Sequence, residues 1–198
     1  MNIETFILLI LIICIVFILC KKIFNFDMTY VRSDIDNNQY LVRNVYDKQE
    51  AANTLARVRQ NIILLSDYLY NNKTNEKNAK YVEYIDRLHQ RVRNIIIVES
   101  SQDSSYTSYS INKGEQIVFC LRSRKLANDL HDINLMMYVV LHEISHVACP
   151  IYDNHGPLFR DIFGFITRNA IDIGIYKFID FSSSRPEYCG MTITESII

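Results

Sequence analysis

The chain has 198 residues, of which 49% are hydrophobic, and a formal net charge of −1 at pH 7. This length fits one domain with an appendage, and it is too short for several large domains. The near-neutral charge gives no strong signal for nucleic-acid binding, which depends on clustered basic side chains that contact phosphates.

The N-terminal appendage is apolar. An uncharged run of 16 residues extends from Thr5 to Cys20 and is followed by Lys21 and Lys22. At ~1.5 Å per residue the run spans ~24 Å, and lysine side chains that reach the lipid headgroups would extend it toward the ~30 Å hydrocarbon core. No small-residue cleavage site of a signal peptide is present. We therefore predict that residues 1–26 form a transmembrane anchor in the lipid bilayer.

The distribution of charge predicts the orientation of this anchor. The basic side chains lie after the run and only Glu4 lies before it, so the positive-inside rule places the following domain in the cytosol. The expected location is that of a single-pass membrane protein with a cytosolic C-terminal domain.

The rest of the chain divides into a tether and a folded domain. Residues 27–46 are rich in Asp and Asn and predict a tether with a short strand at 40–45, and residues 47–198 predict the domain. The sequence Asp47–Glu50 is typical of a helix capping box. The expected elements of the domain are helices at 47–70 and 79–93, a strand at 94–99, a hairpin of 106–111 and 116–122, and helices starting after 132 and at 157.

Cysteine spacing predicts no disulfide in the domain. Cys120, Cys149 and Cys189 are odd in number and far apart, and no pair has the C-x-x-C spacing of a zinc ribbon. We expect each of them to be a small buried side chain.

The pattern His-Glu-x-x-His occupies positions 142 to 146. On a helix it places His142 and His146 on one face, where both imidazoles bind one zinc ion, and directs Glu143 toward the attacking water. Asp132 is a suitable N-cap for this helix, and Pro150 ends it because the residue before a proline is disfavoured in a helix.

A catalytic zinc ion usually has three protein ligands, so a third ligand is expected nearby. His155 is the leading candidate, because the 8 residues between it and His146 are enough for the chain to turn back before a helix that begins at Pro157. The carboxylates of Asp153 and Asp161 are alternatives.

These motifs resemble those of a known family. His142 to His146, followed by His155-Gly156-Pro157-Leu158-Phe159, is similar to the zinc metallopeptidases of the WLM and SprT-like groups within the zincin class. The resemblance covers roughly residues 134–173, and its spacing differs from the metzincin pattern. It implies zinc ligation by His142, His146 and His155, with Glu143 as general base. It also implies an α+β fold, a zincin-like minimal metalloprotease domain with helices packed on a small, mostly antiparallel sheet, here preceded by the transmembrane helix.

The predicted function is therefore that of a membrane-anchored zinc-dependent metallopeptidase acting on a protein or peptide. The alternative is a catalytically inactive, zinc-binding, membrane-tethered interaction module. The resemblance also implies that the strand at 116–122 is an edge with which an extended peptide pairs, although an ordinary sheet strand explains it equally well. Tyr152, or a tyrosine of the tail at 182–190, is a candidate donor to the oxyanion.

Overall fold

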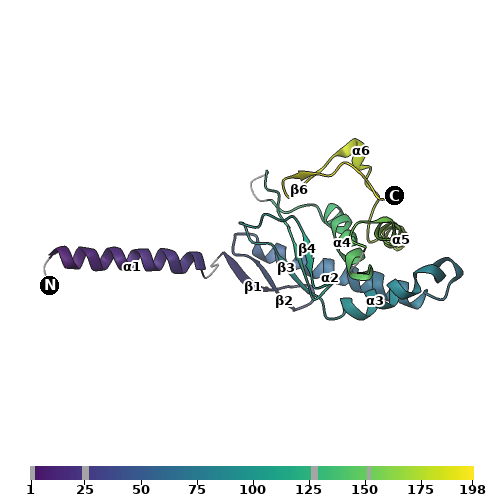
Figure 1. Cartoon of the computed structure of the whole chain (residues 1–198), viewed down its shortest axis with the longest axis horizontal. Coiled ribbons are helices and arrows are strands. Elements are labelled where there is room, and N and C mark those ends of the chain that lie inside the picture. The colour runs from purple at the N-terminus through teal and green to yellow at the C-terminus, as the bar shows by residue number, and fades with distance from the viewer. Residues whose placement is uncertain (1–2, 24–26, 126–128, 151–152) are drawn as a thin grey trace.

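The computed structural model describes residues 3–23, 27–125, 129–150 and 153–198. Its architecture is α+β, as predicted (Figure 1). The helices are α1 (Ile3–Ile23), α2 (Lys48–Asn71), the 3-10 helix η1 (Glu76–Tyr81), α3 (Val82–Val92), α4 (Ile133–Ala148), α5 (Pro157–Asp172) and α6 (Phe181–Ser184). The strands are β1 (Met28–Arg32), β2 (Gln39–Arg43), β3 (Ile96–Glu99), β4 (Tyr109–Ile111), β5 (Gln116–Phe119), β6 (Glu187–Tyr188) and β7 (Met191–Thr192).

The central sheet has the strand order β3-β5-β4. β5 pairs with β4 in antiparallel fashion, with Tyr109 opposite Val118, and with β3 in parallel fashion, with Ile97 opposite Ile117. The pairs β1–β2 and β6–β7 are antiparallel, so antiparallel pairing predominates among the described strands. The predicted hairpin of β4 and β5 is confirmed, and β4, not β5, lies at the edge of this sheet.

The apolar N-terminal run forms α1, which extends away from the rest of the chain in Figure 1. Across residues 3–23, 27–125, 129–150 and 153–198, no helix combines the length and the apolar character needed to cross a membrane. The predicted transmembrane anchor at 1–26, and the single-pass membrane location that depended on it, are therefore wrong. The uncharged run has 16 residues, and its ~24 Å falls short of a ~30 Å hydrocarbon core.

Residues that the sequence predicts to be a tether form the β1–β2 hairpin, which packs on α2. The side chain of Asn53 in α2 accepts from the backbone N–H of Asp34 at 2.9 Å and from the hydroxyl of Ser33 at 3.2 Å. Tyr40 and Val42 of β2 are buried in the core. The polar composition of this segment reflects these turn contacts as well as exposure to solvent.

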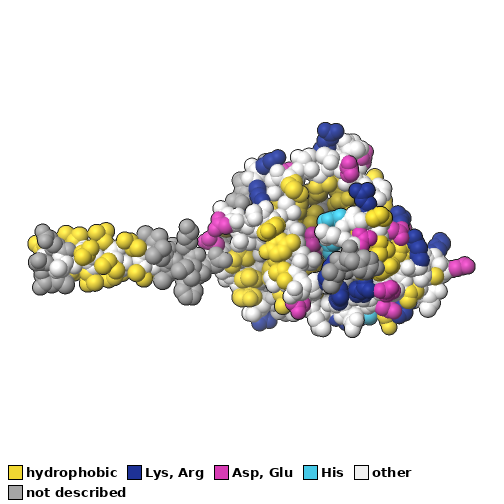
Figure 2. Space-filling view, viewed as in Figure 1, with side chains coloured by type: hydrophobic (Ala, Val, Ile, Leu, Met, Phe, Trp, Pro, Cys, Tyr) yellow, Lys and Arg dark blue, Asp and Glu magenta, His cyan; other side chains and the backbone are white. Residues whose placement is uncertain are grey.

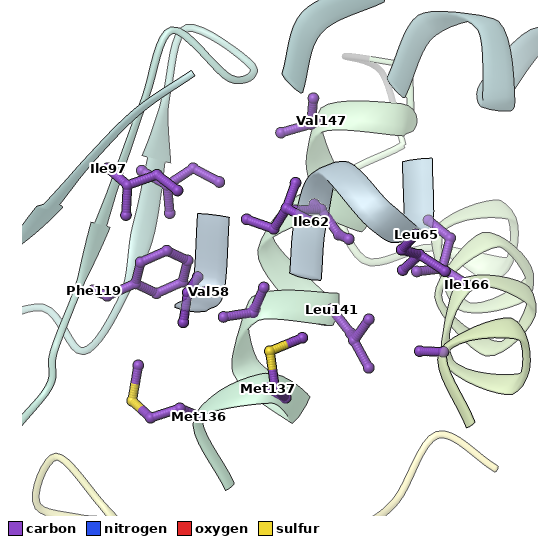
Figure 3. Close-up of a cluster of buried hydrophobic side chains, with 14 of the residues drawn as sticks. Val58, Ile62, Leu65, Ile97, Phe119, Met136, Met137, Leu141, Val147 and Ile166 are labelled. Atoms are coloured by element: carbon purple, nitrogen blue, oxygen red, sulfur yellow. The ribbon is translucent and has the colours of Figure 1, made fainter. Parts of the chain in front are cut away.

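The hydrophobic core fills the space between the central sheet and α5. Figure 3 shows α2 and α4 between these two layers, with buried side chains converging from all of them. The labelled residues are Val58, Ile62 and Leu65 of α2, Ile97 and Phe119 of the sheet, Met136, Met137, Leu141 and Val147 of α4, and Ile166 of α5. α4 is thus a buried helix, which makes it a rigid support for side chains at its surface.

Four charged side chains form a buried cluster where β2, β3 and the N-terminus of α2 meet. The Glu99 carboxylate accepts from Arg122 Nε at 2.7 Å and from the backbone N–H of Arg43 at 2.7 Å. Arg122 Nη1 also donates to Asp47 Oδ2 at 2.6 Å. The predicted capping box at Asp47 is therefore wrong: its side chain makes no capping bond, because its carboxylate faces Arg122.

The C-terminal segment is attached to the sheet by a disulfide between Cys120 and Cys189, which are 69 residues apart in sequence. The prediction of separate buried cysteines is thus wrong for these two and holds for Cys149, which is free and buried. Cys189 lies in the β6–β7 turn with φ of 54°, and its backbone N–H donates to His131 Nε2 at 3.1 Å. Sequence spacing could not reveal a pair brought together only by the path of the chain.

Loss of charge at Glu99 should destabilise the domain strongly. Glu99→Gln leaves Arg43 and Arg122 in a dry environment without their shared counter-ion, and we expect the free energy of unfolding to fall by about 3 kcal/mol. Urea denaturation followed by circular dichroism measures this change. Glu76→Gln, at an exposed site, is the matched control and should change stability by less than about 0.5 kcal/mol. Equal effects of the two variants would contradict a structural role for the cluster.

Removal of the disulfide should also destabilise the domain, because it closes a long loop in the unfolded chain. For the double variant Cys120→Ala/Cys189→Ala we expect a loss of about 2–5 kcal/mol, measured by the same denaturation under non-reducing conditions. Cys14→Ala, which changes an exposed thiol of α1, is the control. A dithiol reductant should lower the stability of the wild type toward that of the double variant and leave the double variant unaffected.

Candidate metal centre

α4 carries the His-Glu-x-x-His pattern on a well-defined helix. The carboxylate of Asp132 accepts from the backbone N–H groups of Asn134 and Leu135 at 2.9 and 3.2 Å, so the predicted N-cap is confirmed. The helix ends at Ala148, and Cys149 is extended with ψ of 144°, as expected for a residue that precedes a proline.

Two arginines of α3 hold the C-terminal end of α4. Arg87 Nη1 donates to the carbonyl of Ala148 at 2.9 Å, and Arg91 Nη1 donates to the carbonyl of Val147 at 2.9 Å. The last carbonyls of a helix lack intrahelical partners and carry partial negative charge, so cationic donors stabilise them. The contact of these arginines with α4 could not be read from their spacing in the sequence.

The loop after α4 brings His155 back to the helix. Cys149 Sγ contacts the carbonyl oxygen of Asp153 at 3.2 Å, and the Asp153 carboxylate accepts from the Leu158 N–H at 3.0 Å at the start of α5. Gly156 is required in this loop, because a Cβ there would lie 2.1 Å from Asp153 Oδ1. The carboxylate that starts α5 thus occupies the space of a side chain at 156.

The imidazoles of His142, His146 and His155 converge. Their Nε2 atoms lie 3.1 Å (142 to 146), 3.0 Å (146 to 155) and 3.2 Å (142 to 155) apart. The ring of Phe159 stacks on His146 with centroids 4.2 Å apart, and Phe163 packs edge-on against His142 at 5.3 Å. Aromatic side chains of α5 therefore fix the orientation of both helical imidazoles.

This arrangement is suited to a cation. Burial lowers the pKa of His142 to about 4 and that of His146 to about 3, so both rings are neutral at pH 7 and keep a lone pair for a metal. Three imidazole Nε2 atoms at mutual contact cannot all be paired with one another by hydrogen bonds, because each nitrogen either donates or accepts. The three side chains form a group that could hold a metal ion.

Glu143 lies beside this group in a cavity of about 660 Å³. The residue is only 5% exposed, and burial raises its pKa to about 7. The cavity is bounded by β4 and its turn, by α4, and by the C-terminal segment that carries Tyr188 and Met191. In Figure 2 histidine side chains (cyan) are visible in a hollow of the domain surface with hydrophobic side chains around it.

The three candidates for a third ligand lie in different surroundings. His155 is within 3.2 Å of both helical histidines, whereas Asp161 forms hydrogen bonds with Lys80 and Tyr81 on the other side of α5, and Asp153 is used at the start of α5. Of the tyrosines suggested for the oxyanion, Tyr188 lines the cavity and its hydroxyl is 2.7 Å from Ser108 Oγ. Tyr152 lies outside the described residues.

The strand proposed from the family resemblance as the substrate edge was identified incorrectly. β5 is paired on both sides, by β3 and β4, so the strand at 116–122 is not free to pair with a peptide. β3 and β4 are the two edge strands of this sheet, and Tyr109 and Ser110 of β4 line the cavity. The sequence predicted both the hairpin and the strand at 94–99, but it did not predict that this strand pairs with β5 and so places β5 inside the sheet.

A second group of potential ligands escaped the sequence analysis. Cys120, His131 and Cys189 place their ligand atoms within 4.8 Å of one another, although the two sulfur atoms are joined in the structure. No spacing motif connects these three positions, and only the fold brings them together.

Comparison with known proteins gives two viral relatives, and no protein-family model matches the chain. Protein 136R of Invertebrate iridescent virus 6 is 33% identical over 82 residues, which cover 41% of this chain and 45% of that protein. Crystal structures of Wss1 from Saccharomyces cerevisiae and of a Wss1 mutant are similar at a TM-score of 0.36. The first is 18% identical and covers 50% of this chain and 82% of Wss1, a likeness that establishes neither fold nor activity.

The uncharacterized protein R325 of Acanthamoeba polyphaga mimivirus is 44% identical over 191 residues, which cover 96% of this chain and 94% of that protein. Identity at this level over nearly the whole of both chains shows common membership, and the chain belongs to the family of mimivirus R325.

Proposed function

We propose that the chain is a zinc-dependent metallopeptidase in which His142, His146 and His155 hold the metal and Glu143 is the general base. The observation that carries the proposal is the convergence of three imidazole Nε2 atoms, 3.0–3.2 Å apart, next to a buried carboxylate in an open cavity. The similarity of the two motifs to those of WLM and SprT-like peptidases agrees with it.

The donor set fits zinc and is unsuited to magnesium or calcium. Zn–N distances of ~2.0–2.1 Å in a tetrahedral site place the nitrogen atoms about 3.3 Å apart, close to the observed triangle. Neutral imidazole ligands favour zinc over magnesium or calcium, which prefer oxygen. Three protein ligands leave a fourth position open, as in catalytic rather than structural zinc sites. Zinc bound here would supply a Lewis acid for the scissile carbonyl and lower the pKa of a water molecule.

The chain's own residues account for the remaining chemistry. The Glu143 carboxylate, with a pKa raised by burial to about 7, takes a proton from the attacking water and returns it to the leaving amine nitrogen. A carboxylate with a pKa near neutrality is suited to both steps, because it is present in both protonation states. Binding of a cation at the three histidines favours the ionised form of Glu143, which is the form that accepts the proton.

The substrate that the cavity favours is an extended peptide. β4 is an edge strand of the central sheet, and its residues line the same cavity as Glu143 and His142. Its unpaired backbone groups are available to an added strand, which would bind a peptide through main-chain hydrogen bonds with little dependence on sequence. The peptide bond would then lie across α4, next to the three histidines.

Replacement of the third histidine should weaken metal binding. His155→Ala leaves two imidazoles, and we expect zinc affinity to fall at least about 100-fold, since even residues that only support a ligand contribute 10- to 100-fold. Competition with a chromogenic chelator measures the affinity. Asp161→Asn is the matched control and should retain wild-type affinity, because Asp161 contacts Lys80 and Tyr81. The reverse result would identify Asp161 as the ligand.

Replacement of the general base should abolish catalysis but not metal binding. Glu143→Gln keeps the size of the side chain but replaces the basic carboxylate with an amide, which does not take up a proton. We therefore expect the rate of peptide cleavage to fall by about 10²- to 10⁴-fold, with one zinc still bound per chain. Cleavage of casein and zinc content are measured on the same samples. Chelation should inactivate the wild type, and added zinc should restore it. Zinc binding without cleavage in the wild type, over a broad set of peptides, would contradict the peptidase and support a binding module.

A further inference from the structure

The walls of the cavity differ in chemical character. Among the described residues that line it, Lys113 is the only lysine or arginine and Glu143 is the only carboxylate. The side bounded by the C-terminal segment and α4 is largely apolar, with Tyr138, Val139 and Met191. A cation on one side and an apolar wall on the other are the features of a site that selects among substrates.

Lys113 is held in place by its backbone. It lies in the β4–β5 turn with φ of 54°, next to Asn112 with φ of 48°, the left-handed pair typical of tight hairpin turns. Arg91 Nη1, which holds the end of α4, also contacts the Lys113 carbonyl at 3.3 Å. Gly114 packs so closely on Val147 that a Cβ would lie 2.9 Å from its side chain. The turn and the metal-binding helix therefore form one rigid unit.

The ammonium group of Lys113 is available to a ligand. Within the part of the chain that the structure describes, it has no hydrogen-bond or ion-pair partner, although the residue is half-buried. The Glu115 carboxylate of the same turn forms no ion pair with Lys113. It accepts a hydrogen bond from Asn112 Nδ2 at 2.6 Å instead. Lys113 lines the same cavity as His142, His146 and His155, so its positive charge lies on the wall of the candidate metal centre.

We infer that Lys113 is a specificity-determining residue that binds a carboxylate of the peptide substrate beside the three histidines. The inference rests on the proposed peptidase function and adds the chemistry of the substrate. A carboxylate complements the charge of the ammonium, and their ion pair at this half-buried position is stronger than one on a fully exposed surface. The carboxylate belongs to an acidic side chain or to the C-terminus of the peptide, and both have the same chemistry.

Binding measured without turnover tests this inference. The full chain carrying Glu143→Gln and loaded with zinc is titrated by calorimetry with a peptide series in which one Glu or Gln is moved through successive positions. We expect one position at which the Glu peptide binds about fivefold more tightly than the Gln peptide, as for a favourable ion pair. Added Lys113→Met should abolish the preference, Lys113→Arg should retain it, and Lys113→Glu should reverse it in favour of Lys peptides. High salt should weaken it.

Two further arms complete the test. A free and an amidated C-terminus on the same peptides distinguish the chain end from a side chain as the source of the carboxylate. Lys77→Met, which removes an exposed lysine that does not line the cavity, is the control and should keep the wild-type preference. Equal binding of Glu, Gln, free-acid and amidated peptides, or a preference that survives Lys113→Met, would overturn the inference. Failure of the unmodified, zinc-loaded chain to cleave any of these peptides would count against the peptidase function and not against Lys113.

Discussion

The geometry of the candidate metal centre depends on how the C-terminal end of α4 is held. Two arginines of α3 donate to the last carbonyls of this helix, and one of them also contacts the turn between β4 and β5. The helix must end soon after His146 so that the chain can turn and place His155 beside the other two histidines. If the end of the helix frayed, the position of His155 would vary. The two arginines donate hydrogen bonds to the last carbonyls of α4, which the next turn of the helix would have bonded if the helix had continued. The two arginines therefore fix the positions of α3, α4 and the β4–β5 hairpin relative to one another.

Two other interactions hold the sheet, the N-terminal hairpin and the C-terminal segment together. A buried ion cluster centred on Glu99 joins β2 and β3 to the start of α2 and to Arg122, which follows β5. A disulfide then attaches the C-terminal hairpin to Cys120, two residues before Arg122. Buried ion pairs contribute little net stability, but they are costly to break one partner at a time, so they disfavour alternative packings. The end of β5 is thus the place where the sheet, the N-terminal hairpin and the C-terminal segment are joined.

Sequence reasoning succeeded where the information was local. The N-cap at Asp132, the end of α4 before Pro150, and the Asn112-Lys113-Gly114 turn depend on a few neighbouring residues with defined backbone preferences. His155 also follows a short loop between two helices, and it lies within 3.2 Å of His142, while its role as a metal ligand stays a prediction. The prediction failed for Asp47, Cys120 and the edge strand, because their partners are distant in sequence. It also failed for α1, where the apolar run was assigned to a membrane although its length is marginal.

The residues around His155 show how a short motif follows from physical constraints. His155 lies just before α5, where the first backbone N–H groups of the helix have no intrahelical partner. The Asp153 carboxylate accepts from one of them, the N–H of Leu158, and this leaves His155 free to face the other two histidines. Its carboxylate then occupies the space beside position 156, so a side chain there would have to displace it, and glycine avoids this conflict. In the first turn of α5, Phe159 stacks on His146, so the helix that follows the third histidine also orients the second. The spacing of His, Gly and Phe is therefore the spacing of one helix start packed against the helix that carries His142 and His146.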